Sequence, residues 1–362
     1  MILSIYKTSK LAKGLALIFM YVHHLFTCGK AETIEFLLLS PAAARRVAVG
    51  MKLCVALFVF LTAYGITAQH RIKKLSTTRD ISCDTVSRYI KLMCNYWVIF
   101  FISLAITCLL RNPEKFFGSN IYDIAFWFLS DFLGLSYLFG VTTLNPTWWY
   151  MSVAIILIVI MPLLICFVKK FGAFISLSLV VLFPAIIDYR HILSPYMLAA
   201  TLGICFSQYG LFEKCFASIT KKTLYKILTL IFCVSFISCT IWFRETIGIL
   251  YYITDAISAA LVCFVCCLYI GKTPLLNTVL EFIGRHSANL FLIHTFIYNY
   301  WLTDFIFAPK YSVLVLSTLL ITTLLISFVL EKIKKLLHFD KGVKFLVGKA
   351  NKLVCFVMES SA

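Results

Sequence analysis

Long apolar runs recur along almost the whole chain, and this feature limits the possible folds more than any other. Eleven runs have spanning or near-spanning length: Leu11–Cys28, Gly50–Ala68, Leu92–Leu110, Ile121–Phe139, Trp148–Val168, Phe171–Ile187, Leu193–Tyr209, Leu224–Phe243, Ile247–Ile270, Ala288–Phe307 and Ser312–Leu330. Only loop-length stretches separate them. Because about 20 apolar residues in a helix cross the hydrocarbon core of a bilayer, the pattern predicts one polytopic membrane domain.

The composition leads to the same class. Of the 362 residues, 61% are hydrophobic and 14% are charged, whereas a soluble domain carries roughly 25% charged residues. The net charge of +17 would suggest nucleic acid in a soluble protein, but here the basic residues form short clusters between apolar runs. That distribution is typical of the positive-inside rule and of attraction to anionic lipid. We therefore expect the lipid bilayer, and no nucleic acid, as a partner.

The distribution of Lys and Arg favours ten spans with both termini in the cytoplasm. If Ile121–Phe139 does not cross, 24 Lys and Arg residues lie inside and 9 outside. Leaving out Leu193–Tyr209 instead gives 23 and 10, so charge alone does not identify the segment that fails to span. Asp131 lies within Ile121–Phe139, and an unpaired carboxylate there costs about 2.5–3.5 kcal/mol on insertion scales. This favours Ile121–Phe139 as a re-entrant or interfacial segment.

The predicted fold is thus an all-α helical membrane bundle with about ten transmembrane helices and one possible re-entrant segment. Residues 1–330 form the membrane domain, and residues 331–362 form a basic amphipathic tail on the cytoplasmic surface. The first apolar run is interpreted as a span and not as a removable signal peptide, since no small-residue cleavage site follows His23 and His24. The expected location is the plasma membrane.

No pattern in the chain indicates a metal or a bound cofactor. The 14 cysteines lie mostly inside apolar runs and lack the paired loop spacing of a disulfide framework or a zinc site. There is no phosphate-binding Gly-rich loop, no dinucleotide fingerprint and no grouping of His, Cys and carboxylates at metal-ligand spacing.

The first apolar run carries the polar residues most suited to chemistry. Lys13 and His24 are eleven residues apart, which on a helix places them within about 20° of one face and about 16 Å apart along the axis. His23 points about 80° away from that face. An intramembrane imidazole is a functional hypothesis by default; alternatively, both histidines bond to water or to a neighbouring helix near the outer interface.

The same residues resemble a known signature. Lys13-Gly14-Leu-Ala followed by His24 is similar to the basic residue, ten-residue gap and histidine of acyltransferase family 3. Weaker similarities follow in Thr62–Gly65, in Arg88–Lys91, in Trp148–Ser152 and in Gly284–His294. Together they cover most of the chain, and the first-span signature is the most specific.

The resemblance implies a membrane O-acyltransferase. Such an enzyme moves an acyl group, here with acetyl favoured, from a cytoplasmic acyl-CoA to a hydroxyl of an extracytoplasmic carbohydrate or glycan precursor. Lys13 would neutralise donor phosphates, and His24 would act as the general base or, in a less favoured variant, be acylated itself. No cofactor beyond the acyl donor is implied.

Four further residues are candidates for substrate or donor binding. Arg88 and Lys91 could hold acidic groups of the donor, although a solvated basic loop explains them equally well. His294 could contact substrate or act as a hydrogen bonder between helices. Asp131 could orient a histidine or bind a hydroxyl, or it could be a loop residue that faces water.

Two other functional classes remain open at this point. A transporter or flippase of polar or lipid-linked sugars would also need intramembrane His and Asp residues. A structural or sensory membrane protein is the third possibility.

Overall fold

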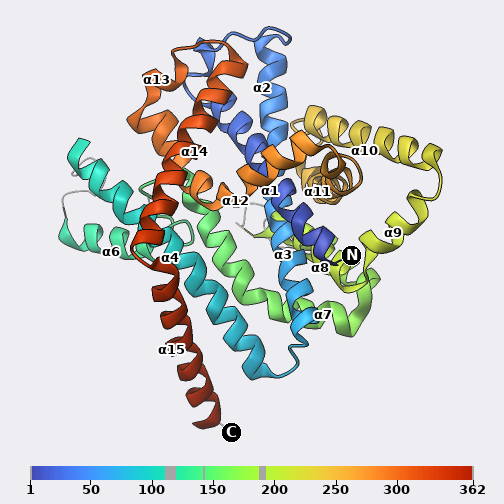
Figure 1. Cartoon of the computed structure of the whole chain (residues 1–362), viewed down its shortest axis with the longest axis vertical. Coiled ribbons are helices and arrows are strands. Elements are labelled where there is room, and N and C mark those ends of the chain that lie inside the picture. Colours follow the sequence, from blue (N-terminus) through green and yellow to red (C-terminus); the bar gives the residue numbers. More distant parts are fainter. Residues whose placement is uncertain (1, 111–119, 142, 187–192, 361–362) are drawn as a thin grey trace. The chain divides into compact units, whose positions relative to one another are not determined.

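The computed structural model describes residues 2–110, 120–141, 143–186 and 193–360. These residues are almost entirely helical, and the β-structure among them is one isolated bridge between Glu35 and Tyr311 (Figure 1). The chain divides into two compact units. Unit 1 comprises Met1–Lys73, Leu163–Ala288 and Asp304–Thr322, and unit 2 comprises Lys74–Pro162, Asn289–Thr303 and Thr323–Ala362. The predicted all-α class is confirmed.

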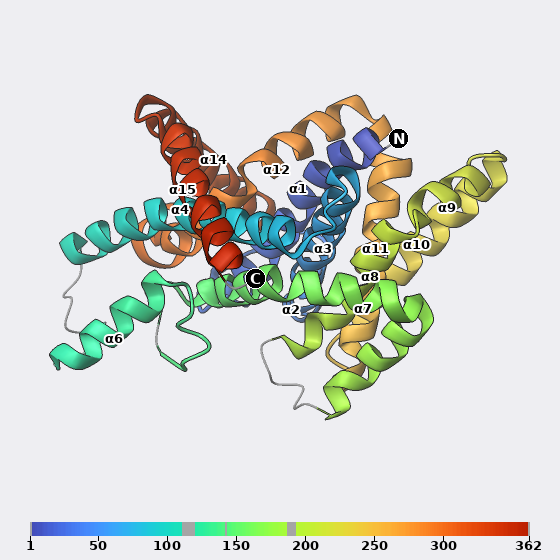
Figure 2. The ribbon, with the colours of Figure 1, turned by 90° about the horizontal axis from the view of Figure 1, so that it is seen from below.

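Four helices form the centre of unit 1. They are α1 (Ile2–Thr27), α3 (Cys54–Lys73), α8 (Met197–Gln208) and α11 (Tyr251–Leu268) (Figures 1 and 2). Two of them, α3 and α11, each pack on the other three. Around them lie α2 (Pro41–Gly50), α9 (Leu211–Ile219), α10 (Thr223–Phe243) and α13 (Thr303–Phe307). Short 3₁₀ turns precede several helices, among them η2 (Met51–Leu53), η4 (Ser194–Tyr196) and η5 (Gly248–Leu250). Since α1 belongs to this centre, its polar residues are held by neighbours on several sides.

Glycines allow the backbones in unit 1 to approach closely. A Cβ atom added to Gly203 of α8 would lie 2.5 Å from the carbonyl oxygen of Phe60 on α3. A Cβ added to Gly14 of α1 would lie 2.1 Å from the carbonyl oxygen of Leu280, and one added to Gly284 would lie 1.8 Å from that of Lys10. Leu280 and Gly284 belong to α12 (Pro274–Thr295). Small residues at such crossings let membrane helices pack backbone to backbone.

We expect Gly284→Ala to destabilise the protein by about 3 kcal/mol or more, because over-packing typically costs about 1–3 kcal/mol and here the clash is with backbone. The matched control is Gly65→Ala on α3, where an added Cβ meets nothing within 4 Å. The measurement is the unfolding midpoint of both purified variants in the same detergent. Equal midpoints for the two variants would show that the α1–α12 crossing is looser than the structure indicates.

Unit 2 is organised around α4 (Thr78–Leu110), with α6 (Ile121–Phe132) and α15 (Phe339–Ser360). Three longer helices contribute segments to both units: α7 (Trp149–Ile186), α12 and α14 (Ser312–Leu336). The core of unit 2 is rich in buried aromatic rings, including Tyr96, Phe100, Trp148 and Phe296. The tail helix α15 packs along α4 (Figure 2).

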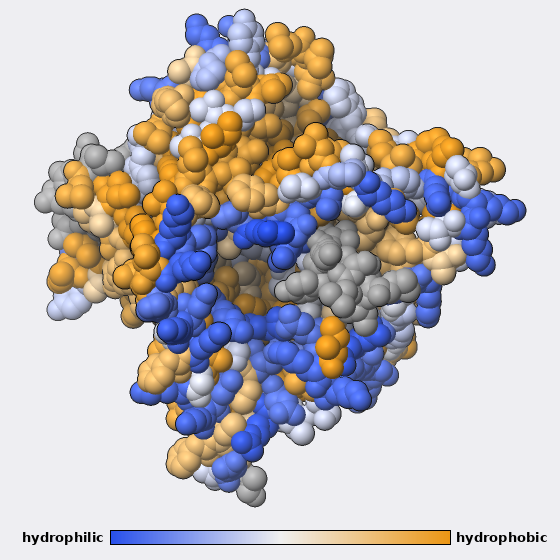
Figure 3. All heavy atoms as spheres, viewed as in Figure 1, coloured by the Kyte–Doolittle hydropathy of each residue, from blue (hydrophilic) through white to orange (hydrophobic). Residues whose placement is uncertain are grey.

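Six helical segments among the described residues are long and apolar enough to cross a membrane. They are Pro41–Lys73, Thr78–Leu109, Pro146–Leu182, Thr223–Phe243, Gly248–Lys272 and Ser312–Leu336. In Thr223–Phe243 only 11% of the apolar window is buried, and hydrophobic spheres cover this helix in Figure 3. A helix with apolar residues on all sides and little burial is suited to lipid contact. The polytopic membrane architecture is confirmed, and the number of ten crossings stays a prediction.

Several apolar runs differ in extent from the observed helices. Ile121–Phe139, expected to be re-entrant or interfacial, contains the 12-residue helix α6, and Leu193–Tyr209, the alternative segment that fails to span, contains the η4 turn and the 12-residue helix α8. At 1.5 Å per residue each is about 18 Å long, well short of the hydrocarbon thickness of about 30 Å. Trp148–Val168 and Phe171–Ile187 both lie on α7, which bends at Gly172 (φ 79°).

The predicted span Ala288–Phe307 also has different limits. Its helix, α12, begins at Pro274 and ends at Thr295, where a π-helical turn (Phe296–Trp301) follows. Hydropathy could not locate this start, because Glu281 and Arg285 lower the apolar average over the first half of α12. The helix itself tolerates these charges since the side chain of Arg285 is exposed and pairs with Glu281.

Candidate active site

Helix α1 carries both the predicted base and the predicted donor-binding cation. It runs from Ile2 to Thr27 as one helix, so the expected spacing of Lys13 and His24 on one face holds. Lys13, His23 and His24 are all partly buried. His24 has an interaction partner in the folded chain, and its ring centroid lies 5.0 Å from that of His23. The end of α1 therefore presents two adjacent imidazoles in a semi-enclosed setting.

The two histidines differ in their surroundings. The Nδ1 atom of His23 lies 2.8 Å from the carbonyl oxygen of Ala48 on α2. Because a carbonyl only accepts, Nδ1 must carry the proton, and Nε2 is then the acceptor nitrogen of a neutral ring. His23 is thus tied to a neighbouring helix, which matches the sequence-based expectation that it points away from the face shared by Lys13 and His24.

A buried ion pair lies near this end of α1. The Arg244 guanidinium donates to the Asp255 carboxylate through Nη2 at 2.8 Å and through Nε at 3.1 Å. The side chain of Arg244 is 9% exposed and that of Asp255 is 3% exposed. Arg244 also interacts electrostatically with His23 and with Lys52 of η2. A polar cluster thus surrounds the first histidine, and we call these four residues the outer cluster.

Local structure explains why Arg244 and Asp255 meet. Helix α10 ends at Phe243 and α11 begins at Tyr251, with the η5 turn between them. The two helices pack on each other, which brings the last residues of one beside the first turns of the other. The Arg244 guanidinium carbon also lies 4.5 Å from the centre of the Tyr251 ring, an arrangement that stabilises a buried cation further.

The sequence analysis did not single out Arg244, Asp255 or Lys52. The available signal was Asp255, which is the lone carboxylate inside the apolar run Ile247–Ile270. A carboxylate at such a position requires a partner. Its partner could not be named from the sequence, since Arg244 lies outside the run, in the short connection that precedes it.

Two of the other predicted residues, Asp131 and His294, lie in unit 2 within one hydrogen-bond network. The Asp131 carboxylate accepts from the Ser136 hydroxyl at 3.1 Å and from the Leu144 backbone N–H at 2.9 Å. The network continues from the adjacent residue, Asn145, through two further side chains to the His294 ring. The Thr147 hydroxyl donates to Asn145 Oδ1 at 2.8 Å, the hydroxyl oxygens of Thr147 and Thr295 lie 3.0 Å apart, and the Thr295 hydroxyl lies 3.3 Å from His294 Nε2.

This network holds the loop between α6 and α7 against α12. Asp131 is 1% exposed and does not face water as a loop residue would. Burial raises the pKa of Asp131 to about 6, and the hydrogen bonds from Leu144 and Ser136 partly offset that effect. Among the described residues the Asp131 carboxylate contacts no histidine directly. His294 is fully buried, and its Nδ1 lies 2.7 Å from the carbonyl oxygen of Phe291 one turn earlier.

Arg88 and Lys91 have different surroundings on α4. The Arg88 Nε atom lies 2.6 Å from the carboxylate of Asp84, four residues earlier on the same helix. Lys91 is exposed and lines a cavity of unit 2. Arg88 is therefore engaged by a carboxylate, whereas Lys91 faces a space that a ligand could enter.

Comparison with known proteins identifies the chain's family. A family model described as an acyltransferase domain matches residues 8–332. The chain belongs to acyltransferase family 3. Comparisons with curated proteins and with solved structures gave no match. As a family 3 member the protein is an acyltransferase, and the suspected membership is confirmed.

The matched region contains every site residue predicted from the sequence: Lys13, His24, Arg88, Lys91, Asp131 and His294. It also contains the outer cluster, and it ends before Lys334 and helix α15. Among the described residues of this acyltransferase, no group of three or more His, Cys, Asp and Glu side chains could hold a metal ion.

Proposed function

We propose that this family 3 acyltransferase transfers an acetyl group from cytoplasmic acyl-CoA to a hydroxyl of a carbohydrate or glycan precursor outside the cytoplasm. One observation carries the proposal: α1 is a single helix from Ile2 to Thr27. Lys13 and His24 therefore lie on one face and about 16 Å apart, which is about the reach of an extended pantetheine arm. The proposed location is the plasma membrane, with both termini in the cytoplasm.

In this proposal Lys13 neutralises phosphate groups of the donor, and His24 accepts the hydroxyl proton. The acceptor oxygen attacks the thioester carbonyl, the carbon–sulfur bond breaks, and CoA leaves as the thiolate. General-base catalysis of this kind contributes typically about 10²–10⁴ in rate. An alternative with the same residues is transient acylation of His24, followed by transfer to the hydroxyl.

The outer cluster supports an acceptor site at the His24 end of α1. A sugar hydroxyl needs a polar environment when it leaves water, and a paired guanidinium and carboxylate supply both donors and acceptors. Lys52 adds a second cation beside Arg244 and Asp255. In the ten-span topology the connections that carry Lys30, Arg244 and Lys310 all face the outside, and the ion pair of Lys30 with Asp304 at 2.7 Å is compatible with that arrangement.

The remaining predicted residues have proposed roles that follow their contacts. Lys91 is exposed and could hold an acidic group of the donor, and Arg88 could do so by exchanging Asp84 for that group. Asp131 and His294 support the loop between α6 and α7 through the shared network. They act on the reaction through position and not by direct contact with substrate.

Mass analysis of cell-surface glycans tests the function. Cells that produce the protein should carry glycans heavier by one acetyl group per modified site, and cells without it should carry the same glycans lacking that mass. Cells with His24→Ala protein at equal abundance are the control and should resemble cells without the protein. If the glycan itself fails to reach the surface when the protein is absent, the chain moves glycans, and the acyl-transfer proposal is wrong.

A further inference from the structure

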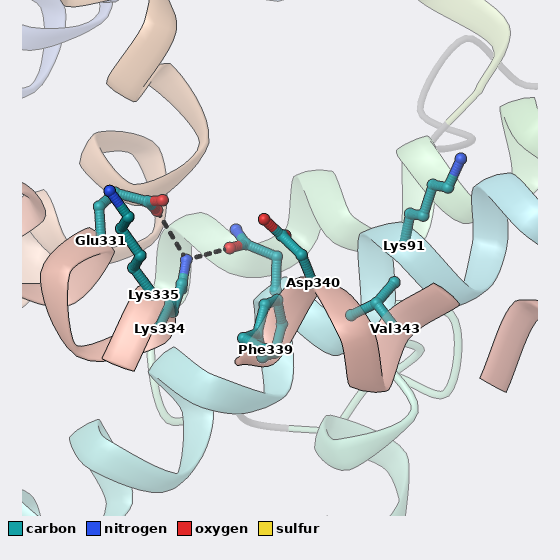
Figure 4. A pocket seen from close by; sticks show the side chains of 8 residues that line it. Lys91, Glu331, Lys334, Lys335, Phe339, Asp340 and Val343 are labelled. Atoms are coloured by element: carbon teal, nitrogen blue, oxygen red, sulfur yellow. Dashed lines mark hydrogen bonds and ion pairs between the residues drawn. The ribbon is translucent and has the colours of Figure 1, made fainter. Parts of the chain in front are cut away.

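Unit 2 contains a cavity of about 520 Å³, and one of its lining residues, Lys91, already has a proposed role in holding the donor. Eight residues from α4, α14 and α15 line it: Lys91, Asn95, Glu331, Lys334, Lys335, Phe339, Asp340 and Val343 (Figure 4). The volume falls within the range of ligand pockets, roughly 300–1,000 Å³. Five of these residues lie beyond residue 332, where the family match ends.

One side of the cavity is fixed by an internal hydrogen-bond network. The Lys334 ammonium is largely buried and donates to Glu331 at 2.9 Å, to Asn289 at 3.1 Å and to Asn95. Figure 4 shows its bond to Glu331 as a dashed line. The Asn289 amide also donates to Glu331 at 2.8 Å. These groups satisfy one another, so they form a rigid wall and are not available to neutralise a ligand.

The other charged groups leave an excess of positive charge. Lys91 and Lys335 lie at opposite ends of the lining in Figure 4, with Phe339 and Asp340 between them. Neither lysine forms an ion pair or hydrogen bond with another described side chain. With Lys334 and Glu331 compensating each other, two ammonium groups face one carboxylate, that of Asp340. Such a cavity attracts an anion with room for more than one charge.

We propose that this cavity binds a phosphate ester, held by Lys91 and Lys335. Ammonium groups form strong charge-assisted hydrogen bonds to phosphate oxygens, and Phe339 and Val343 offer apolar surface to the rest of the ligand. Two kinds of ligand contain such a phosphate ester. One is the nucleotide end of CoA, and this candidate rests on the proposed function. The other is the headgroup of an anionic phospholipid. The exposed side chains of Leu336 and Leu337 beside the cavity suit the second source.

Direct binding tests the site without reference to acyl transfer. The full chain in nanodiscs of zwitterionic lipid is titrated with adenosine 3′,5′-diphosphate, and separately the chain in detergent is titrated with a short-chain phosphatidylglycerol. In whichever of the two titrations shows binding, Lys91→Ala and Lys335→Ala should each weaken the affinity for that ligand about tenfold. Asp340→Asn should strengthen it, because it removes the one uncompensated negative charge. Lys344→Ala is the matched control, since it removes an exposed charge from α15 outside the cavity.

The variants also separate binding from misfolding. Lys335→Arg keeps the charge and should keep most of the affinity, and each variant should elute as the wild type in size-exclusion chromatography. Unchanged affinity of Lys91→Ala and Lys335→Ala in both arms would overturn the proposal, as would an equal loss in Lys344→Ala. If the ligand binds as expected while cell-surface glycans show no acetylation, the proposed function fails and the phosphate site stands.

Discussion

His24→Ala protein is expected to lose acyl transfer by about 10²–10⁴-fold while it still binds acyl-CoA. The loss follows because the hydroxyl of the acceptor is a poor nucleophile unless a base takes its proton, and His24 is the imidazole on the same face as Lys13. Donor binding survives because the proposed phosphate contact, Lys13, is about three helical turns away. The measurement is acyl-CoA binding and acyl transfer by purified protein reconstituted in lipid.

Three variants of the same helix serve as controls. Lys13→Ala should mainly weaken acyl-CoA affinity, and Lys13→Arg should retain or improve it, because a guanidinium matches phosphate oxygens bidentately. His23→Ala should be milder than His24→Ala, since His23 is tied to the Ala48 carbonyl and not to the shared face. Full acyl transfer by well-folded His24→Ala protein would exclude the catalytic role of His24.

Asp255→Ala is expected to lower the free energy of unfolding by about 3–5 kcal/mol. The substitution leaves the Arg244 guanidinium buried without its carboxylate, and an uncompensated buried charge is far more costly than the pair was worth. Arg244→Ala should lower the free energy of unfolding by a comparable amount, because it leaves the Asp255 carboxylate buried without its guanidinium. The measurement is unfolding of the purified variants in detergent, followed by a structural probe such as tryptophan fluorescence.

A double variant distinguishes stability from function. Replacing the pair with apolar residues, Arg244→Met with Asp255→Leu, should recover most of the lost stability, because neither charge is then left alone. Acyl transfer should remain low if the pair shapes the acceptor site, as proposed for the outer cluster. Wild-type activity in a stable double variant would show that the pair contributes to folding alone.

The site could be predicted in part. The eleven-residue spacing of Lys13 and His24 defines a face as soon as the segment is helical, and α1 is helical throughout. The local pattern also indicated that His23 differs from His24. Arg244 and Lys52 were missed because each comes from a different element and looks ordinary in its own segment, and Asp255, although it is the lone carboxylate of its apolar run, does not reveal its partner. Their common position depends on how α10, α11 and η2 pack, which no local pattern encodes.

The fold, like the candidate site, could be predicted only in part from the sequence. Apolar runs predicted an all-α membrane protein, because a chain this apolar can satisfy its backbone in lipid only by forming helices or a closed barrel. The charge count named Ile121–Phe139 and Leu193–Tyr209 as the two candidates that fail to span, but the apolar runs did not predict that each contains a helix of only 12 residues, α6 and α8. An apolar run reports burial from water, and burial against protein gives the same signal as burial in lipid.

The sequence by itself determined the all-α membrane class of the protein and the face of α1 that carries Lys13 and His24, because hydropathy and helical period are local properties. Only the tertiary structure decided where Gly14 and Gly284 let α1 and α12 meet, which charges pair inside unit 1, and that the tail helix α15 lines a cavity. These features depend on side chains that are distant in the chain and become neighbours only when the helices pack.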